Sequence, residues 1–91
     1  MPYVMADKIG IYGFIGLSLD EQANYTWQVG AFLHNRKGEG FNANLYGVED
    51  FYVEVRYDTE RNAIAQIMPF NSPDLLQPYL EQIDLRDLLG Q

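Results

Sequence analysis

FNANLYGVEDFYVEVRYDTERNAIAQIM, residues 41–68, contains three short runs in which apolar and polar side chains alternate. The runs cover residues 41–46, 51–57 and 63–68. Alternation with a period of two is typical of a strand that buries one face. Asn62 tolerates the left-handed backbone that ends a tight turn, and Pro69 ends the last run. The stretch therefore predicts consecutive antiparallel strands. Their inward side chains are expected to form one core: Phe41, Ala43, Leu45, Phe51, Val53, Val55 and Tyr57.

The same alternation is found on the N-terminal side of this stretch. Residues 24–34 place Tyr25, Trp27 and Leu33 on one side and Phe32 and His34 on the other. The segment NRKGEG separates this run from residues 41–46, so we predict a hairpin whose loop contains two glycines with positive φ.

Residues 8–18 complete the predicted sheet as a first strand. Both sides of this run are apolar, which indicates a central or covered strand. Its three glycines have a spacing that differs from the dinucleotide-binding fingerprint. Ser18 and Glu21 have the spacing of a capping box, so we predict one short helical turn after the strand.

The C-terminal segment changes to a helical period. Ser72, Pro73 and Asp74 form a helix-start signature, and Leu76, Leu80 and Ile83 line one stripe. Pro78 predicts a break near Gln77. The fold class is therefore predicted to be α+β: an antiparallel meander of four to five strands followed by a C-terminal helix packed on one face. A strongly bent, barrel-like sheet is the alternative, and residues 1–91 are expected to form a single domain.

Composition and charge restrict the classes of function. The chain carries a net charge of −7, of which −6 falls in residues 48–91. Such a chain is repelled by phosphate backbones and anionic lipid, so we predict no direct nucleic-acid binding and no membrane binding. The chain has no cysteine and one histidine, so neither a thiolate nor a usual zinc site is expected. A cytoplasmic location and no cofactor are predicted.

The second face of the predicted sheet is the candidate docking surface, because it gathers aromatic side chains opposite the helix-covered core. An exposed apolar patch of this kind marks an interaction site. The predicted protein-binding residues are Tyr12, Phe14, Phe32, Tyr46, Tyr52 and Glu54.

A second candidate site surrounds the predicted hairpin loop. Backbone N–H groups of a glycine-rich turn can hold a carboxylate or phosphate, although a plain hairpin turn explains the same residues. The weaker ligand-binding set is His34, Arg36, Lys37, Asn42 and Asn44. No catalytic residue and no metal ligand is predicted.

These observations favour a small acidic interaction module over an enzyme. It would act as an adaptor, subunit, regulator or inhibitor by binding a protein partner with a basic surface, or by forming a homodimer. The alternative is a small-ligand-binding or enzymatic domain with a pocket near His34 and the sheet aromatics.

Overall fold

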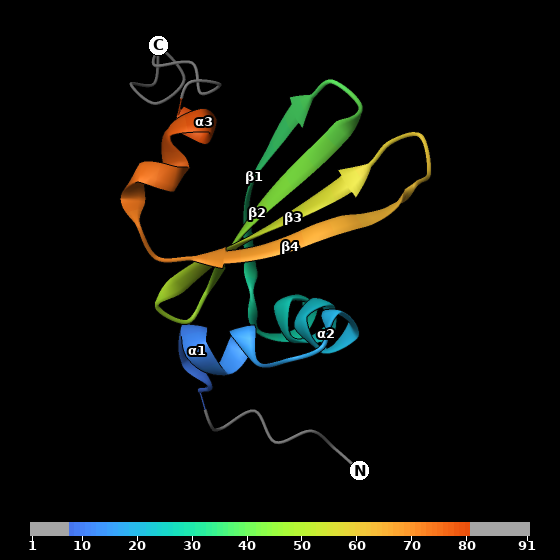
Figure 1. Ribbon diagram of the computed structural model, residues 1–91. Helices are drawn as coiled ribbons and strands as arrows, with labels where there is room; N and C mark the ends of the chain where they lie inside the picture. The colour runs from blue at the N-terminus through green and yellow to red at the C-terminus, as the bar shows by residue number, and fades with distance from the viewer. Residues whose placement is uncertain (1–7, 81–91) are drawn as a thin grey trace.

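A computed structural model of the chain describes residues 8–80, which form an α+β structure built on a four-stranded sheet (Figure 1). The elements in chain order are α1 (Gly10–Ile15), α2 (Leu19–Val29), β1 (Ala31–Gly38), β2 (Phe41–Val48), β3 (Phe51–Asp58), β4 (Ala63–Phe70), the 3₁₀ turn η1 (Pro73–Leu76) and α3 (Gln77–Leu80). The sheet is an antiparallel meander in the order β1-β2-β3-β4. Within residues 8–80 it stays open, with β1 and β4 at its edges, so it is not a closed barrel.

The strands predicted from residues 41–68 are confirmed, with slightly wider bounds. Asn62 has a φ of 54°, as its place at the end of the β3–β4 turn requires. Asp58 stabilises the same turn, because its Oδ1 accepts the backbone N–H groups of Glu60 and Arg61. These bonds lower the pKa of the Asp58 carboxyl. Pro69 does not end β4, since an edge strand tolerates the missing donor.

The hairpin prediction is confirmed for the turn but not for its bounds. Strand β1 continues to Gly38, so the turn is only two residues long. Gly40 has a φ of +77°, as expected, whereas the positive φ predicted for Gly38 is not found. A Cβ at position 38 would lie 2.2 Å from the Phe41 ring.

The strand predicted for residues 8–18 is wrong, because Gly10–Ile15 is helical. The carboxylate of Glu49, in the β2–β3 turn, accepts the backbone N–H groups of Ile9 (3.3 Å) and Gly10 (3.0 Å). Glu49 also accepts a hydrogen bond from the hydroxyl of Tyr25. Glu49 lies 39 residues from Gly10 in the sequence, so no local sequence pattern predicts this cap.

The strand predicted for residues 24–34 is also wrong over its first half. The capping box of Ser18 and Glu21 is present, but it begins the eleven-residue helix α2 rather than a single turn. The helix buries Tyr25 and Thr26 against the sheet and ends where Gly30 begins the connection to β1. Trp27 and Leu33, predicted to be core residues, are exposed.

Helices lie on both faces of the sheet. The buried residues therefore form two clusters, not the single core that the sequence predicts. Helices α1 and α2 lie against one face, and α3 lies on the other side (Figure 1). The α1–α2 face contains Val48, Phe51, Val53 and Val55, with Phe14 packed between them and α2. Leu45 and its cross-strand partner Glu54 both lie on the α3 face. Leu45 packs there with Phe70 and Tyr79.

The C-terminal prediction is only partly testable within the described residues. Ser72 accepts the backbone N–H of Asp74, and the chain changes from 3₁₀ to α geometry at Gln77. Tyr79 is buried on the α3 face, whereas Leu80 is exposed. Ile83 and the rest of the predicted helix lie outside the described residues.

Replacing Glu49 tests the long-range cap of α1. Glu49→Gln is expected to lower the free energy of unfolding by about 1–3 kcal/mol, because two helix N–H groups and one phenol lose a charged acceptor. Denaturant unfolding measures the change, and Asp50→Asn, at the exposed neighbouring turn position, is the matched control. Equal stability of the two variants would show that the Glu49 carboxylate does not hold α1.

Candidate functional site

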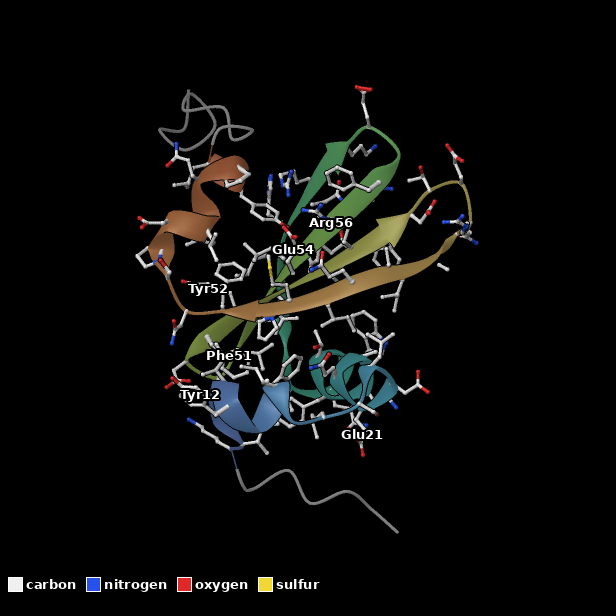
Figure 2. The ribbon with its side chains drawn as sticks, viewed as in Figure 1. Tyr12, Glu21, Phe51, Tyr52, Glu54 and Arg56 are labelled. Carbon is white, nitrogen blue, oxygen red and sulfur yellow. The ribbon has the colours of Figure 1, made fainter. Side chains whose placement is uncertain are left out.

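The predicted aromatic face does not exist as one surface. Phe14 is fully buried in the core, and Tyr12 projects from α1 with 86% of its surface exposed. Phe32 and Tyr46 lie on the α1–α2 face, whereas Tyr52 stacks on Phe70 on the α3 face. Figure 2 shows Phe51 directed toward α1, and Tyr52 and Glu54 on the opposite side of the sheet. The prediction fails for Tyr12 and Phe14 because residues 10–15 are helical. It fails for Phe32 and Tyr46 because Tyr46 pairs with Val53, which places both aromatic residues on the α1–α2 face.

A smaller aromatic surface forms where the end of α2 meets the edge strand β1. We call it the aromatic corner, and it consists of Trp27, Phe32 and Tyr46. The Tyr46 ring lies 5.4 Å from the Trp27 ring and 5.8 Å from the Phe32 ring, measured between centroids. Trp27 is 44% exposed and Phe32 57% exposed. Burial of the Tyr46 hydroxyl raises its pKa, partly opposed by a hydrogen bond with the Asn44 side chain.

The aromatic corner extends around the edge of the sheet. Leu33 is exposed and lies over Gly47 on the other face, where the missing side chain leaves room for it. The pairing of β1 with β2 shifts between Phe32 and His34, so Leu33 has no partner in β2. Phe32 and Leu33 therefore place two successive apolar side chains on opposite faces of the same edge, as strand alternation requires. Within residues 8–80, no further strand pairs with the outer side of β1.

The predicted ligand set is divided between the two faces as well. His34 and Arg36 lie on the α3 face, whereas Lys37, Asn42 and Asn44 belong to the α1–α2 face. Asn44 accepts a hydrogen bond from Asn35 at 2.8 Å, and the His34 ring packs edge-on against Tyr79 at 6.0 Å. Within residues 8–80, these side chains therefore do not line one common pocket.

A cavity of about 300 Å³ lies instead along α2. It lies at the lower end of the volumes that small-molecule sites occupy. None of the predicted ligand residues lines it; its lining residues are Leu17, Glu21, Asn24, Tyr25 and Gln28. Within the described ranges, His, Asp and Glu side chains form no group of three or more that suits a metal ion.

Sequence reasoning missed a buried group of charged side chains on the α3 face. We call it the ionic cluster, and it consists of Glu54, Arg36, Arg56 and Tyr79. Glu54 is only 5% exposed and accepts three hydrogen bonds: from Arg36 Nη2 (3.2 Å), Arg56 Nη2 (3.1 Å) and the Tyr79 hydroxyl (2.8 Å). Figure 2 shows Glu54 and Arg56 on the side of the sheet on which α3 lies.

The ionic cluster is enclosed by aromatic rings. The Phe41 ring lies 4.3 Å from the Arg56 guanidinium and 5.3 Å from that of Arg36, and the Tyr79 ring lies 5.3 Å from Arg36. Burial raises the pKa of Tyr79, and the hydrogen bond to Glu54 and its charge raise the pKa further. The Tyr79 hydroxyl therefore remains a donor that anchors α3 to the sheet.

Comparisons of the chain with protein-family models, with curated proteins and with solved structures give no match. Within residues 8–80, no helix combines the length and the apolar character that crossing a membrane requires.

Proposed function

We propose that this chain is a non-enzymatic protein-interaction module whose contact surface is the aromatic corner. One observation carries the proposal: Trp27 and Phe32 are both about half exposed and pack around the same Tyr46 ring. Aromatic side chains supply much of the binding energy at protein interfaces, because they bury a large area at a low cost in conformational entropy. Leu33, at the same edge, extends the apolar area.

The binding partner that we propose is a different protein, whose surface has an apolar patch surrounded by basic residues. The net charge of −7 favours association with a basic surface and opposes association with a second copy of the chain. Asp20 and Glu21 lie in the first turn of α2, the helix that presents Trp27. An adaptor, a subunit and an inhibitor would all use such a surface. A cytoplasmic location stays a prediction.

A pair of substitutions tests the aromatic corner. In a pull-down from the native host, the double variant Trp27→Ala/Phe32→Ala is expected to retain the basic partner at least about tenfold less well than the wild type. Two central aromatic residues that each contribute more than about 1 kcal/mol account for such a loss. Tyr12→Ala/Leu75→Ala is the matched control, because both residues are exposed and apolar but lie on other elements.

The salt dependence and the mass of the free protein complete the test. Retention of the partner should fall as salt rises, since the charges around the contact accelerate association. Equal retention by the two double variants, at equal thermal stability, would contradict the proposal. A dimeric mass in light scattering that Trp27→Ala/Phe32→Ala converts to a monomer would show that the occupant is a second copy, and the proposed basic partner would be wrong.

A further inference from the structure

The ionic cluster carries an imbalance of charge. Two guanidinium groups face one carboxylate, and the side chains of Arg36 and Glu54 are only 15% and 6% exposed. The Arg56 side chain is 33% exposed, so the cluster reaches the surface at this residue. Asp58 lies in the same strand, but its carboxylate accepts hydrogen bonds from the backbone of the β3–β4 turn. It also forms an ion pair with Arg61, with 3.1 Å between Asp58 Oδ2 and Arg61 Nη1. One positive charge in the cluster is therefore not balanced by a neighbouring described carboxylate.

The two arginines also have too few hydrogen-bond acceptors among the described residues. A guanidinium normally binds a carboxylate with two parallel N–H groups, one to each oxygen. Here the two oxygens of Glu54 are divided, so that each arginine receives one oxygen on its Nη2 atom. The Nε atoms of Arg36 and Arg56 are buried and have no hydrogen-bond partner within the described residues.

Buried N–H groups without an acceptor are rare, and each one calls for a missing partner. An ordered water molecule would satisfy a donor, but it carries no charge. A second oxyanion would satisfy both the donors and the charge. The face of the Phe41 ring, 4.3 Å from Arg56, provides a desolvated wall on which such an ion pair is stronger than in open water.

We propose that Arg36 and Arg56 form a binding site for a small oxyanion, a carboxylate or a phosphate, at the solvent edge of the ionic cluster. The site is independent of the aromatic corner, because Arg36 and Arg56 lie on the opposite face of the sheet. Binding draws the guanidinium groups of Arg56 and Arg36 toward the ion while Glu54 keeps one bond to each.

Gln66 offers a direct internal substitute for the ion. It is exposed, lies on β4, and is the cross-strand partner of Arg56. Residues directly opposite each other in a sheet point to the same face. A carboxylate introduced by Gln66→Glu would therefore stand beside Arg56 and compensate the excess charge from within the chain.

Nuclear magnetic resonance titration of the arginine Nε–H signals tests the site. Inorganic phosphate and acetate are added to separate samples, with chloride at the same ionic strength as the control. We expect saturable shifts of the Arg36 and Arg56 signals by one of the two oxyanions, with a dissociation constant on the order of 1 mM, and no saturation with chloride. The oxyanion that binds more tightly identifies the class of ligand. Identical curves for the oxyanions and chloride would overturn the proposal.

Two variants separate the site from general electrostatics. Arg56→Lys keeps the charge but loses the planar fork, so it should weaken binding at least about fivefold, whereas Arg61→Lys at the exposed turn should leave binding unchanged. Gln66→Glu should abolish the oxyanion-dependent shifts and raise the melting temperature. Wild-type affinity in Gln66→Glu, or a melting temperature below that of the wild type, would overturn the proposal. Gln66→Glu leaves every described cluster contact in place, so the test does not depend on a destabilised variant.

Discussion

Glu54→Gln is expected to lower the free energy of unfolding by about 3–5 kcal/mol, because it removes the charge that compensates two largely buried guanidinium groups. The neutral side chain keeps the size of Glu54 but presents an amide where three donors need acceptors. Part of the loss arises from Tyr79, whose hydroxyl connects α3 to the sheet. Urea unfolding followed by circular dichroism measures the change.

Glu60→Gln is the matched control, because Glu60 is an exposed acid in the β3–β4 turn and its backbone N–H, not its carboxylate, makes the bond described above. We expect this variant to stay within about 0.5 kcal/mol of the wild type. Replacing Glu54, Arg36 and Arg56 together by apolar residues should cost much less than Glu54→Gln, since no unpaired charge is left behind. A Glu54→Gln variant as stable as the Glu60→Gln control would show that the ionic cluster is not buried.

Phe14→Ala is expected to destabilise the protein by about 3–5 kcal/mol, since it leaves a cavity at the centre of the α1–α2 face. Phe14 is fully buried, and its ring meets those of Tyr25 at 6.2 Å and Phe51 at 5.6 Å. Helix α1 has only six residues, so its position depends on this contact and on the Glu49 cap rather than on its own helix propensity. Thermal and urea unfolding both measure the loss.

Tyr12→Ala provides the control within the same helix. Tyr12 is 86% exposed and two residues from Phe14, so its removal should change the free energy of unfolding by no more than about 0.5 kcal/mol. In a strand, residues 12 and 14 would point to the same face and the two variants would behave alike. Equal losses from Phe14→Ala and Tyr12→Ala would therefore contradict the helix.

The sequence predicts the three strands of residues 41–68 because alternation there coincides with turn residues of definite chemistry, such as Asn62. It fails for residues 8–29 because their apolar residues are dense enough to satisfy either period. Tyr25, Trp27 and Val29 alternate as in a strand, yet Tyr25 and Val29 also lie one helical turn apart. The capping box of Ser18 and Glu21 is the local signal for α2, but it indicates only where the helix begins and not its length. The deciding contact for α1, the carboxylate of Glu49, comes from a distant turn.

The candidate surfaces were less predictable than the strands, because both depend on packing across elements. The exposure of Trp27 follows only once α2 is known to be a helix, since its buried side is set by Tyr25 and Thr26. Alternation correctly places Glu54 on the opposite face of β3 from Val53 and Val55. The burial of Glu54 could not be predicted, because it needs Arg36 from β1 and Tyr79 from α3.

Acrylamide quenching of tryptophan fluorescence measures the aromatic corner directly, because Trp27 is the only tryptophan in the chain. In the free protein, Trp27 should be quenched readily, as its 44% exposure requires. Addition of the partner captured through Trp27 and Phe32 should reduce the quenching constant several-fold. Unchanged quenching in the complex would show that the partner binds elsewhere and would contradict the proposed function.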